Sequence, residues 1–368
     1  MLNFDLPKFL GAIMAAAPRV GDVLLAVGCP PQAQIDGTLV KLKMAGMERL
    51  TPFQTEAIVM HLLAMAPPSA AARVRAEGAA HFAYSVPGVS RFRVAVFSQR
   101  GTYAISLRTI PERVPTLVEL GMPEAARAAC HERNGIVLVN GPAGSGRTTT
   151  LASMVAEING QRACHVVTVE DPIEFLHRHA TGTVNQREVG LDTTSVAVGL
   201  ADALRQGAQV LLVSEVRTVE EARLLLEAAE TGHLVLTTVR GFDTASAVLR
   251  ILSLFPAEER PEARVRLARV LRCSFTQQLV PHLDGRKPIV EVWRATRGAV
   301  SQLAEGPLDS VSLADLLRDG EPEGQMGFDR MLEQRVRTGE MEMEAAIANA
   351  VLPRQLELRL LDLREGRP

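Results

Sequence analysis

Short apolar runs alternate with helical patterns through the middle of the chain. Each run is rich in β-branched residues, which is typical of a buried strand. The runs are 136–140, 165–170, 210–213 and 234–239. Between the first two, segment 149–158 places its large apolar residues on one helical stripe, and further helices are predicted over 195–206 and after the capping box at Thr218. Strands that alternate with helices in this way predict an α/β fold with a mostly parallel sheet covered on both faces.

The first part of the chain shows a different pattern. Residues 9–17 predict an amphipathic helix that ends at Pro18. The same stretch resembles the apolar region of a signal peptide, but Asp5 cancels the charge of Lys8, so the helix is the preferred interpretation. Short strands are predicted between residues 22 and 42, with Asp36-Gly37 as a hairpin turn.

A second helix and two further strands complete this region. Thr51 and Pro52 open the helix as its N-cap and first residue. Its buried face is expected to contain Ile58, Leu62 and Met65. Segment 91–96 alternates apolar residues with arginines and an alanine, which predicts a half-buried strand, and the turn after it leads into another strand at 103–107.

Two prolines near residue 112 mark a short polar connection, and we place a domain boundary there. The predicted domains are an N-terminal α+β domain at 1–112, a core at 113–295 and a mainly helical region at 296–368. Residues 261–279 and 313–364 are expected to be largely helical, with a late apolar stripe at Leu356, Leu360 and Leu363.

Composition narrows the class of protein without changing this picture. The chain has 368 residues, of which 47% are hydrophobic and 22% charged, as in soluble globular proteins. A net charge of −2 argues against nucleic-acid binding built on bulk positive charge. No run approaches the ~20 apolar residues that a membrane span needs. The four cysteines lie far apart, without metal-binding spacing, and indicate reduced thiols.

The stretch 141–148 fits the phosphate-binding loop pattern G-x-x-x-x-G-K-[ST] at every position except the lysine, which is Arg147. It lies between a predicted strand and a predicted helix, which is the context that this loop requires. Glycines let backbone N–H groups close around phosphate oxygens, and the helix N-terminus adds its positive dipole end. The sequence therefore predicts a nucleotide site, with Thr148 contributing its hydroxyl to Mg²⁺.

Carboxylates follow two of the predicted strands. Glu170, Asp171 and Glu174 come at the end of one strand, and Glu215 comes at the tip of another. Ligands of an open parallel sheet bind at the carboxyl ends of its strands, so these side chains are expected near the loop. Glu215, on the next-but-one strand after the loop, is the candidate for polarising an attacking water.

These residues carry a family resemblance. The chain resembles the type IV pilus retraction, or twitching-motility, ATPases, within the larger family of type II and type IV secretion ATPases. The matching segments are 141–150, 168–175 (the Asp box), 184–190, 213–217 (Walker B) and 228–235 (the His box). Weaker similarity at 35–37, 91–94, 99–101 and 327–329 extends the resemblance over nearly the whole chain.

The resemblance implies a PAS-like N-terminal domain, a RecA-like P-loop ATPase domain and a helical C-terminal tail. It also implies ATP and Mg²⁺ as ligands and a ring of six subunits at the cytoplasmic face of the inner membrane. There the ring would depolymerise a pilus through an inner-membrane platform protein. Neither a nucleic-acid partner nor a transmembrane segment is expected.

The same resemblance assigns site residues. Glu170 and Glu215 would be the catalytic carboxylates. Arginines of the N-terminal strands would reach the phosphates, and Arg93, Arg100 and Arg108 are unranked candidates. The nucleotide-binding residues would be Gly141, Ala143, Gly144, Ser145, Gly146, Arg147, Thr148, Thr149 and Arg240, with Thr148 also at the metal.

The chain departs from the family at four places. Arg147 replaces the loop lysine, Ser214 replaces the Walker B glycine, Arg240 replaces the second histidine of the His box, and 207–209 replaces an Asp-Pro-Asp. Guanidinium is a planar fork that needs more room than the compact ammonium of lysine. Three of these departures touch the nucleotide site or its support, which favours altered or lost hydrolysis.

Three interpretations follow. The first is an active motor ATPase, which an intact Thr148, Glu170 and Glu215 favour. The second is a non-hydrolysing paralogue that regulates or shares a ring with a competent subunit, which Arg147 and Arg240 favour. The third, a small-molecule kinase, is disfavoured because no lid or acceptor-binding segment is evident.

Overall fold

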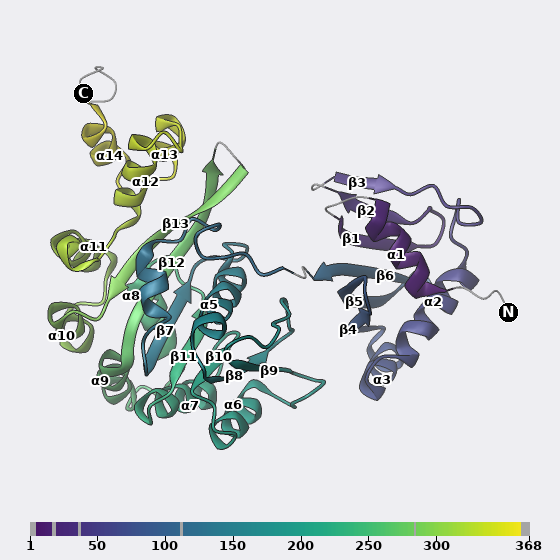
Figure 1. Ribbon diagram of the computed structural model, residues 1–368, viewed down its shortest axis with the longest axis horizontal. Helices are drawn as coiled ribbons and strands as arrows, with labels where there is room; N and C mark the ends of the chain where they lie inside the picture. The colour runs from purple at the N-terminus through teal and green to yellow at the C-terminus, as the bar shows by residue number, and fades with distance from the viewer. Residues whose placement is uncertain (1–4, 17–19, 36–37, 111–112, 283–284, 362–368) are drawn as a thin grey trace. The chain divides into compact units, whose positions relative to one another are not determined.

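The computed structural model describes residues 5–16, 20–35, 38–110, 113–282 and 285–361. The chain divides into two compact units, which are described separately (Figure 1). The N-terminal unit comprises Met1–Arg113 with Glu174–Leu176, and the C-terminal unit comprises Val114–Ile173 with His177–Pro368. No helix within the described ranges is long and apolar enough to cross a lipid bilayer.

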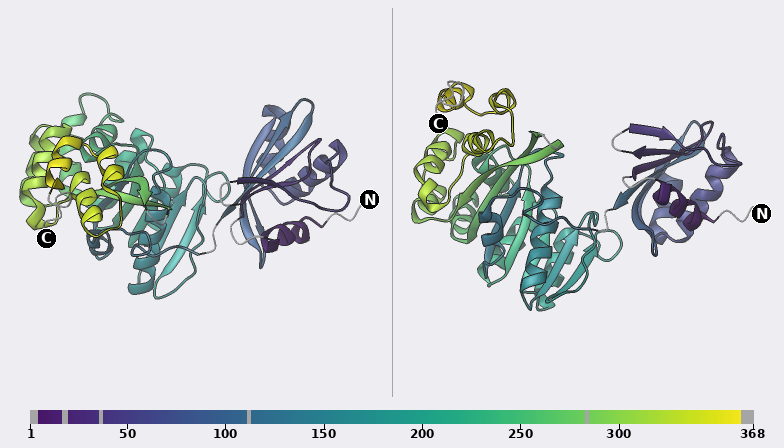
Figure 2. Two further views of the ribbon diagram at one scale, coloured as in Figure 1. Left: turned by 90° about the horizontal axis from the view of Figure 1, so that it is seen from above. Right: turned by 45° about the horizontal axis from the view of Figure 1, so that its top comes forward.

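The N-terminal unit is an antiparallel sheet with helices on one face, and Figure 2 shows it from two further sides. The strand order is β3-β2-β1-β6-β5-β4. The strands are β1 (Val20–Ala26), β2 (Gln32–Ile35), β3 (Thr38–Lys41), β4 (Ala79–Val86), β5 (Ser90–Gln99) and β6 (Thr102–Ile110). The helices are α1 (Leu6–Ala16), α2 (Pro52–Ala64) and α3 (Pro68–Glu77).

Alternation of side chains determines which face of this sheet is covered. Phe92, Val94 and Val96 of β5 are fully buried and share one core with residues of all three helices, whereas Arg93 is exposed on the other face. The half-buried strand is therefore confirmed. The predicted turn Asp36-Gly37 lies outside the described residues, although β2 and β3, which flank it, do pair as an antiparallel hairpin.

Helix α2 follows its predicted capping but not its whole predicted face. The Thr51 side chain and Gln54 form a reciprocal capping box, and Pro52 is the first helical residue. Ile58 and Leu62 are buried, but Met65 is 69% exposed. That part of the prediction is wrong because the helix ends at Ala64, so Met65 is the C-cap and no longer follows the helical stripe.

The C-terminal unit is built on a seven-stranded sheet in the order β13-β12-β7-β11-β10-β8-β9. Neighbouring strands are parallel except for β13, which pairs antiparallel with β12 at one edge. The strands are β7 (Gly135–Asn140), β8 (His165–Glu170), β9 (Thr183–Glu188), β10 (Val210–Val213), β11 (Leu234–Val239), β12 (Leu271–His282) and β13 (Gly285–Arg294).

Helices cover both faces of this sheet, as the alternating pattern predicted. One core holds residues of α6 to α11 and the other holds residues of α4, α5 and α12 to α14. The earlier helices are α4 (Glu124–Ala129), α5 (Arg147–Gln161), α6 (Val196–Arg205), α7 (Val219–Glu230), α8 (Thr244–Leu252) and α9 (Arg260–Val270). The tail contains α10 (Arg297–Glu305), α11 (Ser310–Asp319), the short 3₁₀ helix η1 (Glu321–Glu323), α12 (Phe328–Arg337), α13 (Met343–Ala348) and α14 (Pro353–Arg359).

The helical tail gathers at the β13 edge of the sheet (Figure 1). Leu356 and Leu360 of the predicted late stripe are fully buried, whereas Leu363 lies outside the described residues. The domain boundary at residue 295 stays a prediction, since the tail packs within the same compact unit as the core.

Two sequence expectations are corrected in this unit. Residues 261–279 were expected to be largely helical, but α9 ends at Val270 and β12 begins at the next residue. Strand β12 is buried on both faces yet includes Ser274, Thr276 and Gln277, so it shows neither a period of two nor a continuous apolar run. Strand β9, at the opposite edge, was not predicted either.

The sheet order brings four strand ends together. Strands β7, β11, β10 and β8 are consecutive neighbours, all parallel. The residues that directly follow them, or end them, are Gly141, Arg240, Ser214-Glu215 and Glu170. Because β9 intervenes in the chain, β10 is not the next-but-one strand in sequence after the loop, but only β11 separates it from β7 in the sheet.

Candidate nucleotide site

The loop between β7 and α5 has the backbone that its glycines permit. Gly141, Gly144 and Gly146 have positive φ angles of 143°, 76° and 89°. Only glycine adopts such angles without strain, and Gly146 is also the N-cap of α5, whose first residue is Arg147. The loop therefore opens directly onto a helix N-terminus, where unpaired N–H groups and the helix dipole favour an anion.

Arg147 lies partly buried at the start of α5. Its Nη1 atom is buried and has no hydrogen-bond partner among the residues that the structure describes. Burial lowers the pKa of Arg147 below the ordinary value of an arginine. The charge of Glu215 opposes this shift, and the charges of Arg240 and Arg217 add to it. A buried donor of this kind costs free energy unless an acceptor such as a phosphate oxygen satisfies it.

Glu170 ends β8 as a buried carboxylate. Its Oε1 accepts hydrogen bonds from the Thr168 hydroxyl at 2.6 Å and from the Gln186 amide at 3.0 Å. Gln186 lies on β9, which pairs in parallel with β8, so the edge strand that the sequence did not predict positions this glutamate.

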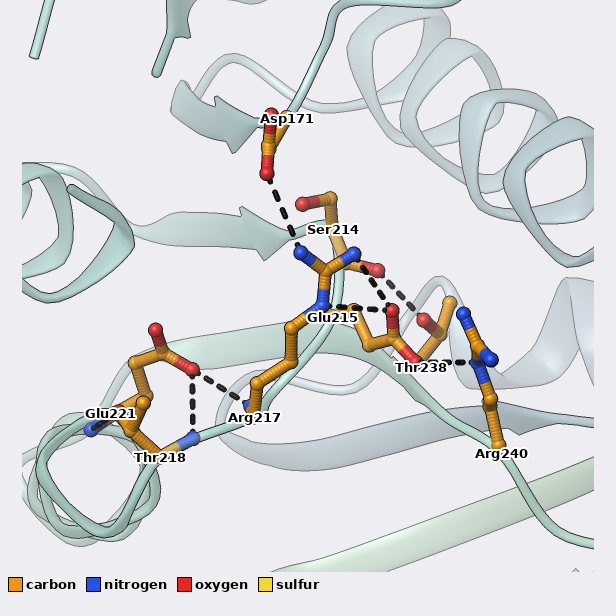
Figure 3. A network of polar contacts seen from close by, with 8 residues as sticks. All are labelled: Asp171, Ser214, Glu215, Arg217, Thr218, Glu221, Thr238 and Arg240. Atoms are coloured by element: carbon orange, nitrogen blue, oxygen red, sulfur yellow. Dashed lines mark hydrogen bonds and ion pairs between the residues drawn. The ribbon is translucent and has the colours of Figure 1, made fainter. Parts of the chain in front are cut away.

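Glu215 lies in a cluster of arginines just beyond β10 (Figure 3). Its Oε2 pairs with Nε of Arg217 at 2.9 Å and with Nη2 at 2.8 Å, and its Oε1 pairs with Nε of Arg240 at 3.2 Å. Arg217 also reaches Asp171 at 3.3 Å. Both carboxylate oxygens are thus engaged, and the Glu215 side chain is only 14% exposed.

The arginines determine the charge state of Glu215. Burial alone would raise its pKa, but the hydrogen bond from Arg217 and the charges of the surrounding arginines outweigh this effect. The pKa is therefore lowered from its ordinary value, and Glu215 is an anion at neutral pH. As an anion it can accept a proton or orient a water, provided that one of its oxygens is released.

A family described as "Type II/IV secretion system protein" matches residues 34–302. The chain belongs to this family. It is 34% identical to the type IV pilus ATPase PilU of Pseudomonas aeruginosa over 92% of this chain and 87% of that protein. It is 35% identical to the type IV pilus retraction ATPase PilT of the same organism, over 92% and 96%. The crystal structure of the pilus retraction motor PilT with bound ADP superposes with a TM-score of 0.86 at 32% identity, covering 96% of this chain and 99% of that one.

These matches confirm the recognised family and the fold class of the type II/IV secretion ATPases. The loop, Glu170 of the Asp box and Glu215 of Walker B lie together in the C-terminal unit, whereas Glu174, at the end of the Asp box, groups with the N-terminal unit. The loop residues are Gly141, Ala143, Gly144, Ser145, Gly146, Arg147, Thr148 and Thr149. Arg240 lies beside the loop because its strand neighbours β7, Val239 being opposite Asn140. The roles assigned to these residues stay predictions.

The three N-terminal arginines differ from one another. Arg108 forms a two-pronged ion pair with Asp22 of β1, at 2.8 and 3.1 Å, within its own unit. Arg93 is exposed on β5, and Arg100 lies in the tight turn after β5 with a φ of 48°. Arg93 and Arg100 have no ion-pair partner in the part of the chain that the structure describes, and the phosphate contact assigned to the three arginines stays a prediction.

Two buried polar residues of the site escaped sequence reasoning. Gln277 of β12 contacts the phosphate loop, and Glu291 of β13 accepts hydrogen bonds from Thr244 at the start of α8. Neither lies in a recognised motif. Gln277 lies in the stretch 261–279, which the sequence predicts to be helical, and Glu291 is a single charged residue within the apolar end of β13.

Proposed function

We propose that this chain binds and hydrolyses ATP as a motor subunit of a type IV pilus retraction system. One observation carries the proposal: the phosphate loop with Arg147, the buried Glu170 and the partly buried Glu215 converge at the carboxyl ends of neighbouring parallel strands. The similarity to pilus retraction ATPases supports the same reaction and the same machinery.

Each residue has a role in this proposal. The loop's backbone N–H groups and the N-terminus of α5 bind the phosphates, and Arg147 supplies the positive charge that lysine supplies in the usual motif. Glu215 orients and deprotonates the attacking water, and Glu170, held by Thr168 and Gln186, is the second carboxylate of the site.

Mg²⁺ would neutralise charge on the phosphates. The Thr148 hydroxyl, partly exposed beside the loop, fits a ligand for it. Within the described ranges, no group of three or more His, Cys, Asp or Glu residues could hold a metal ion. The site therefore suits an ion carried mainly by the nucleotide, as Mg²⁺ usually is in such sites.

We place the chain in a hexameric ring, homomeric or mixed with a related subunit, at the cytoplasmic face of the inner membrane. There it would act on an inner-membrane platform protein, without a nucleic-acid partner. Arg93 and Arg100, which lack an ion-pair partner among the described residues, support a site completed by another subunit.

A second function, a non-hydrolysing regulatory subunit, is favoured by the arginines on Glu215. Arg217 and Arg240 together engage both carboxylate oxygens and depress the basicity of Glu215. In that case nucleotide would bind and turnover would be absent.

Substitution of Glu215 distinguishes the two functions. Glu215→Gln should lower steady-state ATP turnover at least about a hundredfold if Glu215 activates the water. The matched control is Glu220→Gln, which removes the same charge from an exposed position in the first turn of α7. The control should retain wild-type turnover and both variants should bind ADP. A wild-type chain that binds ADP but does not turn over ATP would establish the regulatory function instead.

A further inference from the structure

A buried glutamine lies directly beneath the phosphate loop. Gln277 of β12 is 1% exposed, and both ends of its amide are used. Its Nε2 donates to the backbone oxygen of Ser145 at 2.6 Å, and its Oε1 accepts from the Thr150 hydroxyl at 2.9 Å. A carbonyl oxygen cannot donate, so the Ser145 contact fixes which end of the amide faces the loop.

The two partners of Gln277 lie on either side of Arg147. Ser145 is in the last turn of the loop, and Thr150 is in the first turn of α5, where it is also buried. One side chain thus links the loop to the helix that follows it. The distance between these two segments determines where the loop's donors and the α5 N-terminus lie relative to each other.

The hydrogen bond to the Ser145 oxygen also orients the peptide group that joins Ser145 to Gly146. In a trans peptide the C=O and the following N–H point in opposite directions. Because the Ser145 carbonyl points at the Gln277 amide, the Gly146 N–H of the same peptide group points away from that amide. Without the Gln277 amide this peptide could rotate and present its oxygen, rather than its N–H, to a phosphate.

The loop lies in close contact with β12 at two of its glycines. A Cβ added to Gly146 would lie 3.1 Å from the Gln277 amide nitrogen, and one added to Gly141 would collide with the Gln277 carbonyl oxygen. Strand β12 also holds the residue before the loop, since the Asn140 amide donates to Ser274 at 2.7 Å. Both ends of the loop therefore rest on one strand.

We propose that Gln277 is a positioning residue for nucleotide binding: it seats the phosphate loop on β12 and turns the Gly146 N–H toward the phosphates. The proposal rests on the proposed nucleotide site but not on hydrolysis. Both ends of the Gln277 amide are bonded to the loop and to α5, so its effect is expected on affinity for the phosphates and not on recognition of the base.

The test compares two adjacent glutamines. Gln277→Glu keeps the shape of the side chain but places an acceptor against the Ser145 oxygen and a buried negative charge beneath the loop. Gln278→Glu makes the same substitution one residue on, where the side chain is partly exposed and faces the other side of the strand. Calorimetric titration with Mg²⁺ and ADP at pH 8 should give a Kd at least tenfold weaker for Gln277→Glu and within twofold of wild type for Gln278→Glu.

A pH series gives a readout that a general loss of stability would not. Protonation of the new carboxyl restores a donor toward Ser145, so the Gln277→Glu affinity should recover toward wild type as the pH falls from 8 to 6. Gln277→Met, which has similar length and no charge, should weaken ADP binding without this recovery. It also serves as the test if the glutamate variant does not fold.

The outcomes separate the proposals. Equal affinities for wild type, Gln277→Met and both glutamate variants would overturn the positioning role and leave the nucleotide site intact. No binding of ADP by wild-type protein at millimolar concentration would overturn the nucleotide site and, with it, this inference.

Discussion

At the scale of single residues, the chemistry of the site depends on the ion pairs that Glu215 forms with Arg217 and Arg240. Arg240 is 66% exposed, so its pair with Glu215 is expected to add little to stability. Its effect on Glu215 is larger, because it occupies Oε1 while Arg217 occupies Oε2. In the sequence, Arg147 and Arg240 are two of the departures that favour altered or lost hydrolysis. The contact between Arg240 and Glu215 shows one way in which Arg240 can slow hydrolysis.

Replacement of Arg240 by histidine should therefore raise ATP turnover. Arg240→His frees Oε1 of Glu215 and removes one of the charges that lower its pKa, and both changes make Glu215 a better base. We expect an increase of about three- to fivefold in turnover at saturating ATP, which corresponds to the free energy of one exposed ion pair.

Arg147→Lys combined with Arg240→His should raise turnover by more than the two single changes together, because both residues act on the same small site.

The matched control is Arg250→His, on an exposed face of α8, which should leave turnover unchanged. Measurement of all variants alongside wild type separates release of Glu215 from a general effect of charge. A slower Arg240→His enzyme would show that Arg240 assists the reaction, as an arginine finger does, and would contradict the inhibitory role.

At the scale of elements, the structure shows which strands could be predicted from sequence and which could not. Strands β7, β8, β10 and β11 are buried by helices on both faces and consist mainly of apolar and β-branched residues, so their runs were evident. Strand β12 is also largely buried, but its polar residues Ser274, Thr276 and Gln277 are satisfied by hydrogen bonds with residues of β7, β13 and α5, which only the fold reveals. The site residues at the ends of the apolar strands could be predicted from the sequence. The contacts that β9 and β12 make with these residues could not.

The buried network between β12, β13 and α8 has a titratable centre in Glu291. Its Oε1 accepts from the Thr244 backbone N–H and hydroxyl, both at 2.9 Å, and from the Thr276 hydroxyl at 3.4 Å. Burial raises the pKa of Glu291 to about 7, against the effect of these hydrogen bonds. Near neutral pH the folded protein therefore holds a proton that an unfolded glutamate would release.

This proton makes the stability of the C-terminal unit depend on pH. Because the pKa of Glu291 is raised in the folded state, its contribution to the stability of the fold is greatest below about pH 4.5 and is lost as the pH rises toward 7. A glutamine does not titrate, so Glu291→Gln does not lose stability in this way. The unfolding free energy of the variant relative to wild type should therefore increase between pH 5 and pH 8, by up to about 3 kcal/mol.

Urea unfolding of both proteins at the two pH values measures this difference. Glu305→Gln, at the exposed end of α10, is the control for removal of a carboxylate from the surface. If the difference between Glu291→Gln and wild type stays constant from pH 5 to pH 8, Glu291 does not titrate in this range, and the network holds it as a permanent anion.

At the scale of the whole molecule, the sequence predicted the fold class of each unit. The structure added the ion pairs that form within each unit. The alternating pattern predicted the α/β unit because its helices and strands are long and regular. The sequence could not rank the N-terminal arginines, since the Arg108 pair with Asp22 depends on the register of β1 and β6. The structure shows that Arg108 has an ion-pair partner within its own unit, and which of the three arginines reaches a nucleotide stays a prediction.

A site completed by another subunit requires an assembly. We expect light scattering after size-exclusion chromatography to give about six times the 39.8 kDa chain mass when nucleotide is present. A strict monomer at micromolar concentration, with and without nucleotide, would contradict the ring.

Mixing of inactive variants decides whether the ring shares its sites. Arg93→Ala and Glu215→Gln should each reduce turnover when alone. In a mixed ring, an Arg93→Ala subunit offers its intact Glu215 to the intact Arg93 of a Glu215→Gln neighbour, so one complete site forms where the two meet. Turnover of the mixture should exceed that of either variant by severalfold, because complete sites appear only at such junctions.

The control is a mixture of Arg93→Ala with Arg100→Ala, in which every junction lacks one arginine and no recovery is expected. Rings that form but show no recovery with Glu215→Gln would mean that each chain completes its site alone, and the exposed arginines would then serve another ligand.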